Sequence, residues 1–311
     1  MDTTSPHPKS PVPNLAWSDE LLADARAALL GALGTADAVL HRANGDQSAF
    51  QVDLDDIRRM PTEVVDARTL VYRTGAVRTH FAWEDARGHV EALAALLTRQ
   101  PPAFPPVTLT RAVLEAAALA FHLQDSSESL TVRLARAAGL WATETAYELD
   151  LTTAVSPQDA TGALTRRQEM VETFQQAGIS LLEDRRGHPL ALQIERTTLE
   201  ETGVNLTRTI GKLLPANSSL GVYTVLSGAA HSRTWAAAAN DGTVPGDGGW
   251  GRLESQPSTT VQAVITTLVT LEYWVRTWGA FAGLATATEG DRIAGCTGRF
   301  ALQLRDRHLN G

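Results

Sequence analysis

The sequence is poor in cysteine and in lysine, and the cysteine count and the net charge each exclude a class of structure or function. Cys296 is the only cysteine among 311 residues, so no disulfide can form within the chain and no cysteine cluster can hold zinc. Lys9 and Lys212 are the only lysines, and arginine supplies nearly all the positive charge. With a net charge of -8, the chain lacks the basic balance of proteins that bind duplex DNA.

Several sequence motifs are also missing. There is no H-E-x-x-H or E-x-x-H pair and no phosphate-binding G-x-x-x-x-G-K-[ST] loop, so we expect no metal site and no cofactor. The stretch Met1 to Pro13 has no apolar run and is not a signal peptide. The most apolar stretch, Val261 to Leu284, is interrupted by Glu272 and Arg276, which indicates a buried helix and not a membrane span. The single cysteine then favours a cytoplasmic protein, and the abundance of Ala, Gly, Thr and Arg is typical of a bacterial genome rich in GC.

What the sequence does contain is helical periodicity along most of its length. Hydrophobic residues make up 43%, enough for a buried core. Residues 1–16 are expected to be a disordered tail, followed by an N-terminal helical layer over 17–100. Four prolines between 101 and 106 mark the boundary to a second helical region, 107–311. We expect the two regions to pack as one unit.

One segment departs from helical periodicity. Ile179, Leu181, Leu190, Leu192 and Ile194 alternate with other residues around a turn-rich stretch, which predicts a small β-hairpin over 179–195. The predicted fold class is therefore all-α, a helical bundle with one small β-hairpin insertion. Residues 240–257 are rich in glycine and predict a long loop, either a lid over a site or a plain insertion.

The predicted helix over 110–125 carries a narrow polar stripe on an otherwise apolar surface. Arg111, Glu115, His122 and Asp125 fall within an arc of about 80° at about 100° per residue. Polar side chains on a buried helix are costly unless they pair or face a cleft, and Arg111 and Glu115 have the spacing of an ion pair. The alternative is that the stripe is a narrow solvent face.

The helix that follows repeats this pattern. Arg133, Arg136, Glu144 and Tyr147 lie along one broad side of it. Two helices joined by a tight turn are expected to pack antiparallel, which would bring Arg111 and Glu115 near Glu144 and Tyr147, and His122 near Arg133. The alternative is two independent solvent faces.

A third polar group lies near the C-terminal third of the chain. Tyr223, Ser227 and His231 are spaced by four and line one edge of a predicted helix. Because the strained turn of serine hydrolases is absent, His231 is better interpreted as an acid or base, or as a residue that orients a substrate, than as the partner of a serine nucleophile. A structural histidine is the alternative. The acidic run Asp53, Asp55 and Asp56 is interpreted as a solvated turn.

Two of these motifs together resemble a known family. The chain carries an R-x-x-x-E motif from Arg111 to Glu115, then Arg133 and Arg136, and then an L-S-x-x-x-H motif ending at His231. This order resembles HEPN-like helical domains of uncharacterised bacterial proteins, some of them linked to abortive infection and toxin systems. The resemblance covers about 108–285. It implies that Arg111, Glu115 and His231 line the bundle interior. The R-x4-6-H motif of the ribonuclease members is absent from the matched region, so the resemblance implies a fold more than a nuclease activity.

Three functional hypotheses follow, and they leave open whether the chain is an enzyme. The first is a HEPN-like protein whose catalytic residues are His231, Glu115 and Arg111, with Arg133, Arg136, His122, Tyr223 and Ser227 binding an RNA or nucleotide phosphate. The second is a non-catalytic helical interaction module that forms a homodimer and has satisfied polar pairs and a large exposed apolar face. The third is a small-molecule enzyme with an enclosed apolar pocket under the 240–257 loop.

Overall fold

A computed structural model describes most of the chain. The described residues are 16–156, 158, 160–199, 202–214, 243–244, 252–253 and 256–310. The predicted tail lies almost entirely outside this range, as do Tyr223, Ser227 and His231. Within it the protein consists mainly of α-helices with a small antiparallel sheet, so the predicted fold class is confirmed.

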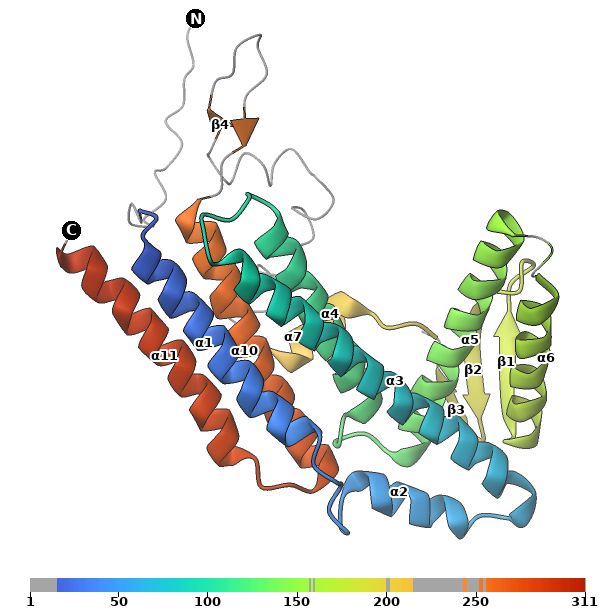
Figure 1. Ribbon diagram of the computed structural model, residues 1–311. Coiled ribbons are helices and arrows are strands. Elements are labelled where there is room, and N and C mark those ends of the chain that lie inside the picture. Colours follow the sequence, from blue (N-terminus) through green and yellow to red (C-terminus); the bar gives the residue numbers. More distant parts are fainter. Residues whose placement is uncertain are drawn as a thin grey trace, which may run out of the picture.

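The larger part of the molecule, which we call the body, is a bundle of helices around one hydrophobic core. Its elements are α1 (Asp19–Leu40), α3 (Thr62–Leu96), α4 (Pro105–Gln124), α7 (Leu206–Leu213), α10 (Pro257–Ala282) and α11 (Ala287–Asn310). Figure 1 shows α1, α10 and α11 side by side, with α3 and α4 against them. Trp83 of α3 and Trp274 of α10 meet edge to face at the centre, with ring centroids 5.3 Å apart.

Local sequence explains where several helices begin. The side chain of Ser18 accepts a hydrogen bond from the Leu21 N–H and caps α1, as its position before two acidic residues predicts. Pro105 and Pro257 occupy the first turns of α4 and α10, where a missing N–H costs nothing. Gly283 ends α10 in the left-handed conformation, with φ of 66°.

α3 is one long continuous helix within the predicted N-terminal helical layer. It runs from Thr62 to Leu96. Within the body it packs against α4, and the N-terminal half of α3 also packs against α5 (Leu130–Val155). Gly75 lies at the crossing with α5, where an added Cβ atom would come within 2.8 Å of the Ala137 Cβ. The small residue on each helix allows this close approach.

The second part, which we call the arm, projects away from the body (Figure 1). It contains the outer half of α5, α6 (Ala160–Gln176) and the strands β1 (Ile179–Glu183), β2 (Pro189–Ile194) and β3 (Thr197–Leu199). β1 and β2 pair antiparallel with Ile179 opposite Ile194, which confirms the predicted hairpin, and β3 adds a third strand beside β2. Trp141 of α5 and Phe174 of α6 fill the space between their helices, with centroids 5.7 Å apart.

α2 (Ala49–Arg58) lies at the base of the arm, and it overturns the interpretation of the acidic run as a solvated turn. All three aspartates are helical. Asp55 and Asp56 are half-buried and pair with Arg58 and Arg59, but Asp53 is only 2% exposed. Asp53 is buried because it shares a face of α2 with the buried residues Leu54 and Ile57.

The predicted loop over 240–257 is described only in part. Its described residues include the short antiparallel strands β4 (Thr243–Val244) and β5 (Arg252–Leu253) and the start of α10. The prediction that this loop is a lid concerns residues that lie mostly outside the described ranges. Among the helices described, none is both long enough and apolar enough to cross a membrane.

The crossing of α3 and α5 yields a prediction from a pair of matched glycines. Gly75→Ala should lower the free energy of unfolding by about 1–3 kcal/mol, because the new methyl group overpacks the contact with Ala137. Gly88→Ala, on the same helix but with no atom near the added Cβ, should instead raise it by about 0.5–1 kcal/mol through helix propensity. Urea unfolding measures both. Equal effects of the two substitutions would contradict close packing at the crossing.

Candidate functional site

The polar stripe of α4 lies on one face of the helix, and its two ends have different surroundings. At the N-terminal end Arg111 Nε donates to Glu115 Oε1 at 2.6 Å, so the expected ion pair forms. At the C-terminal end His122 and Asp125 are buried. The alternative of a plain solvent face therefore does not hold for this end.

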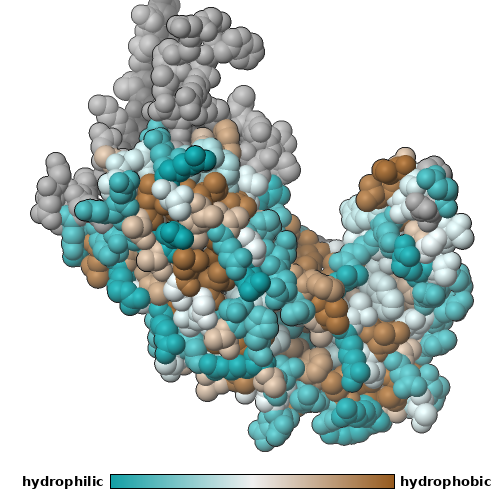
Figure 2. Space-filling model, viewed as in Figure 1, coloured by the Kyte–Doolittle hydropathy of each residue, from teal (hydrophilic) through white to brown (hydrophobic). Residues whose placement is uncertain are grey.

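A groove of about 390 Å³ lies beside the Glu115 end of the stripe. Its walls come from α3, α4, α5 and the segment before α7, and most of the lining is apolar, including Ala116, Leu119 and Leu140. Glu115 and Asp85 contribute carboxylates at its edge. Figure 2 shows a hollow between body and arm.

α5 does not pack antiparallel along α4 as the tight turn predicts, but packs chiefly against α3 and α6. Glu144 consequently pairs with Arg78 of α3, with Nη2 and Oε2 2.6 Å apart. Burial raises the pKa of Glu144 above its ordinary value, against the opposing charge of Arg78. Tyr147, one turn further on, is 68% exposed. The expected cluster of Glu144 and Tyr147 with Arg111 is replaced by contacts to α3 and solvent.

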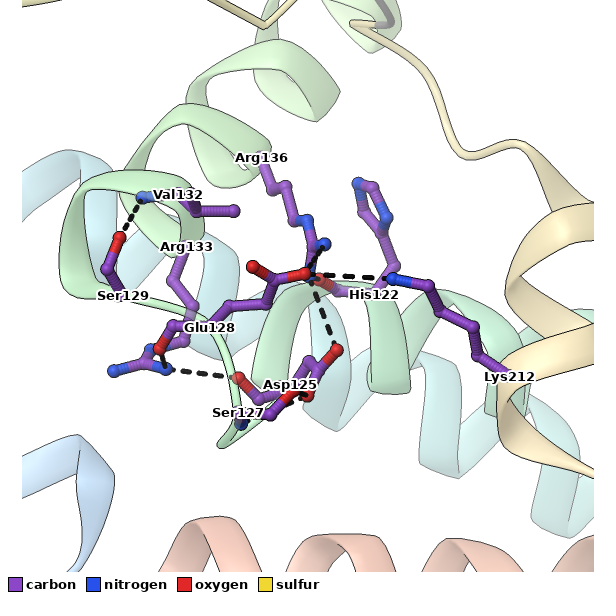
Figure 3. Close-up of polar contacts among 9 residues, drawn as sticks. All are labelled: His122, Asp125, Ser127, Glu128, Ser129, Val132, Arg133, Arg136 and Lys212. Carbon is purple, nitrogen blue, oxygen red and sulfur yellow. Dashed lines mark hydrogen bonds and ion pairs between the residues drawn. The ribbon is translucent and has the colours of Figure 1, made fainter. Parts of the chain in front are cut away.

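The C-terminal end of α4 meets α5 and α7 in a polar junction (Figure 3). Arg136 Nη1 donates to the backbone oxygen of His122 at 2.9 Å, and Arg136 Nη2 donates to Glu128 Oε1 at 2.6 Å. Lys212 Nζ approaches the same Glu128 oxygen at 3.7 Å from α7. In Figure 3 the carboxylate of Glu128 lies between these two cations, and the imidazole of His122 points away from Asp125.

His122 is neutral at physiological pH in this junction. Burial, together with the positive charges of Arg136, Arg208 and Lys212, lowers the pKa of His122 to about 3, and the nearby Asp125 only partly opposes them. A positive charge on the buried ring would be removed from water and would lie close to those cations. The ring therefore offers a neutral donor and acceptor, and an anion bound beside it would raise its pKa.

Arg133, another predicted binding residue, belongs to a buried network instead of an open cleft. Its Nε and Nη2 donate to the two carboxylate oxygens of Asp53, both at 2.7 Å. Tyr72 donates to Asp53 Oδ2 at 2.5 Å. Arg133 Nη1 also donates to the backbone oxygens of Asp125 and Glu128. Although burial opposes it, hydrogen bonding to Asp53 raises the pKa of Arg133.

The structure thus divides the predicted site residues. His122 and Arg136 come together at the junction, Arg111 and Glu115 pair beside the groove, and Arg133 is held by Asp53. Sequence reasoning missed Asp53, Arg208 and Lys212. Arg208 and Lys212 are four residues apart, and this spacing is a signal that could have indicated a basic face of α7. Tyr223, Ser227 and His231 fall outside the described residues.

Comparison of the chain with protein-family models, with curated proteins and with solved structures finds no match. In the part of the chain that is described, no three His, Cys, Asp or Glu side chains are grouped so that they could hold a metal ion. The polar junction presents the hydrogen-bond donors and positive charges that suit a small anion, and the groove presents mainly apolar surface.

The low pKa of His122 predicts a loss of stability in mild acid. The folded pKa, about 3, lies below the unfolded value of 6.5, so the unfolded state binds the proton first and stability falls as the pH drops below 6.5. The loss from this residue should reach about 2 kcal/mol at pH 5 relative to pH 8. His122→Gln should remove that part of the pH dependence, measured by urea unfolding between pH 8 and pH 5.

His41→Gln is the control, because His41 is exposed and its replacement leaves His122 in place. This variant should keep the wild-type loss of stability in acid. A wild-type pH dependence in His122→Gln would show that the ring is not held neutral in the folded state.

Proposed function

We propose that the protein is a helical interaction module that forms a homodimer through the outer half of α5. One observation carries the proposal. Tyr147, Leu151 and Val155 are 68%, 66% and 75% exposed and follow one another at intervals of four, so they form an apolar stripe on one face of the helix. Large exposed apolar side chains that cluster in this way are typical of protein contacts.

The position of the stripe supports a protein contact over a site for a small molecule. It lies where α5 projects beyond the body, and Figure 2 shows a hydrophobic patch at this free end of the arm. The side chains stand on a convex helix without surrounding walls. A convex apolar ridge buries little of a small ligand, but it packs well against another helix.

A second copy of the chain is the occupant that fits this stripe. An antiparallel copy of α5 related by a twofold axis places Leu151 against itself and Tyr147 against Val155, so the surface is self-complementary. The flanking acidic residues already have partners. Glu148 Oε1 lies 2.5 Å from Arg166 Nη2, and Asp150 Oδ2 lies 2.8 Å from His188 Nε2. The rims of two identical copies therefore do not repel each other strongly.

The dimer is tested by replacing the central residue of the stripe. Leu151→Arg would bring two like charges together at the twofold axis and should convert a dimer to a monomer at micromolar concentration. Sedimentation equilibrium measures the mass. Leu302→Arg, which changes a leucine of α11 with 50% exposure, should leave the dimer intact. A monomeric wild type, or equal loss of the dimer in both variants, would contradict the proposal.

A second candidate function, phosphate binding, is favoured by the polar junction at α4, α5 and α7. Arg136, Arg208 and Lys212 act together on the neutral His122, and the carboxylates of Glu128 and Asp125 lie among them. Such a corner suits a phosphate group, with arginine as the planar donor. Together with the HEPN-like order of motifs, this supports the binding of an RNA or nucleotide phosphate, in which His122 would donate or accept a hydrogen bond.

Phosphate binding is tested with a single-stranded RNA of twelve nucleotides in a fluorescence anisotropy titration. Removing the exposed cations in the double variant Arg208→Gln, Lys212→Gln should weaken binding at least tenfold. It should also reduce the slope of log affinity against log salt by about 1.4, because two phosphate contacts are lost. The double variant Arg185→Gln, Arg196→Gln removes the same charge from the exposed turns of the arm and should change neither quantity. Equal weakening in both double variants would place RNA binding elsewhere.

A further inference from the structure

The outer edge of the arm contains a feature that neither the α5 stripe nor the polar junction uses. β1 is an edge strand, since the sheet order is β1-β2-β3 and β1 is paired with β2 alone among the described strands. In an antiparallel edge strand every second residue directs its N–H and C=O away from its neighbour. β1 therefore presents a row of backbone donors and acceptors along its outer side.

A groove runs beside this edge. It has a volume of about 490 Å³ and lies between α6 and β1. Val171 of α6 and Leu181 of β1 give it apolar surface, the buried Phe174 and Ile179 lie beneath it, and Gln175, Ser180 and Glu183 add polar groups. A groove between a helix and an exposed strand edge is the geometry in which extended peptides bind by strand addition.

The edge lacks the devices that usually prevent strand pairing. Between Ile179 and Leu182 there is no proline and no charged residue, and the irregularity of the ladder lies only at the junction of Leu182 and Glu183. The other edge of the sheet, β3, has only three residues and packs against α5. The open edge and the groove thus coincide on the β1 side.

The chemistry of the groove selects the class of ligand. The lining residues include no cation, and the one carboxylate, Glu183, is held by Arg167 Nη2 at 2.7 Å and 2.8 Å. A nucleic acid or another polyanion therefore finds no counter-charge there. An unpaired strand edge is matched only by another extended backbone, and the apolar lining is matched by uncharged side chains at alternate positions of that backbone.

We propose that the groove between α6 and β1 binds an extended peptide segment of a partner protein, which adds to the sheet as a fourth strand beside β1. The segment carries apolar side chains at alternate positions, and these enter the groove over Val171 and Leu181. This proposal goes beyond the proposed homodimer, because it uses a different surface from the α5 stripe and names a different class of partner.

Two neighbouring glutamines provide a matched pair of variants. Gln175 lines the groove and Gln176 does not, and both are exposed on α6. Gln175→Trp places an indole in the groove without disturbing the core, whereas Gln176→Trp makes the same change outside it. Their melting temperatures should agree with that of the wild type.

The experiment selects from a phage-displayed library of random eight-residue peptides on the full-length wild-type protein, after depletion on Gln175→Trp. We expect enrichment of peptides with apolar residues at every second position. A synthetic enriched peptide should bind at least tenfold more weakly to Gln175→Trp and equally well to Gln176→Trp. Two methylated forms of this peptide test the strand pairing. In one, the backbone nitrogens along one edge of the peptide are methylated, and in the other, those along the opposite edge. One of the two forms should no longer bind, because its methyl groups block the hydrogen bonds to β1.

Three outcomes would overturn the proposal: no clone that prefers the wild type to Gln175→Trp, equal weakening in both tryptophan variants, or undiminished binding of both methylated peptides. The same titrations with Leu151→Arg separate this proposal from the dimer. If Leu151→Arg is monomeric and still binds the peptide, peptide binding by the groove is supported independently of the α5 contact. If the wild type is a dimer but binds no peptide, only the groove proposal is rejected.

Discussion

The buried ion pair between Asp53 and Arg133 is the interaction on which the relative position of arm and body depends. Two parallel hydrogen bonds of 2.7 Å join the carboxylate to the guanidinium, Tyr72 of α3 supplies a third, and Phe281 of α10 covers Arg133 at 5.9 Å. Removing two charges from water is costly, and the cost is offset only when all these partners are in place. The pair therefore forms only when α2, α3, α5 and α10 meet in one arrangement, and this arrangement sets the direction in which α5 leaves the body.

That direction determines which surfaces remain exposed. The first half of α5 is covered by α3, with Gly75 against Ala137 at the crossing, while the second half extends beyond it. The face that is buried in the first half thus continues as Tyr147, Leu151 and Val155 in solvent. α6 and the sheet cover the opposite side of α5, and their Met170 and Phe174 belong to a second core that continues into α2 and α3 at the base of the arm. Because the sheet is open, β1 is left as an edge strand at the margin of the arm.

The sequence predicts the features that depend on neighbouring residues and fails where distant residues decide. Helical periodicity, the cap at Ser18, the pair of Arg111 with Glu115 and the hairpin near 179–195 are all local, and the structure contains each of them. The packing of α5 on α3 in place of α4 depends on contacts that are far apart in the chain, such as Arg78 with Glu144. The interpretation of Asp53 as part of a solvated turn is wrong for the same reason. Its buried partner, Arg133, is eighty positions away in the sequence, so no local pattern indicates the pair.

The polar stripe of α4 shows what such long-range contacts mean for function. Arg111 and His122 share a face, but a rise of 1.5 Å per residue separates their Cα atoms by about 16 Å along the helix, so a single phosphate group cannot contact both. The residues near Arg111 border an apolar groove, and those near His122 meet the cations of α5 and α7. Near His122 a phosphate would gain attraction to the cations of α5 and α7. In the apolar groove near Arg111 it would lose its bound water without compensation. The four polar residues that look like one site in sequence therefore belong to two surfaces of opposite character, and only the His122 end has the chemistry that an anion requires.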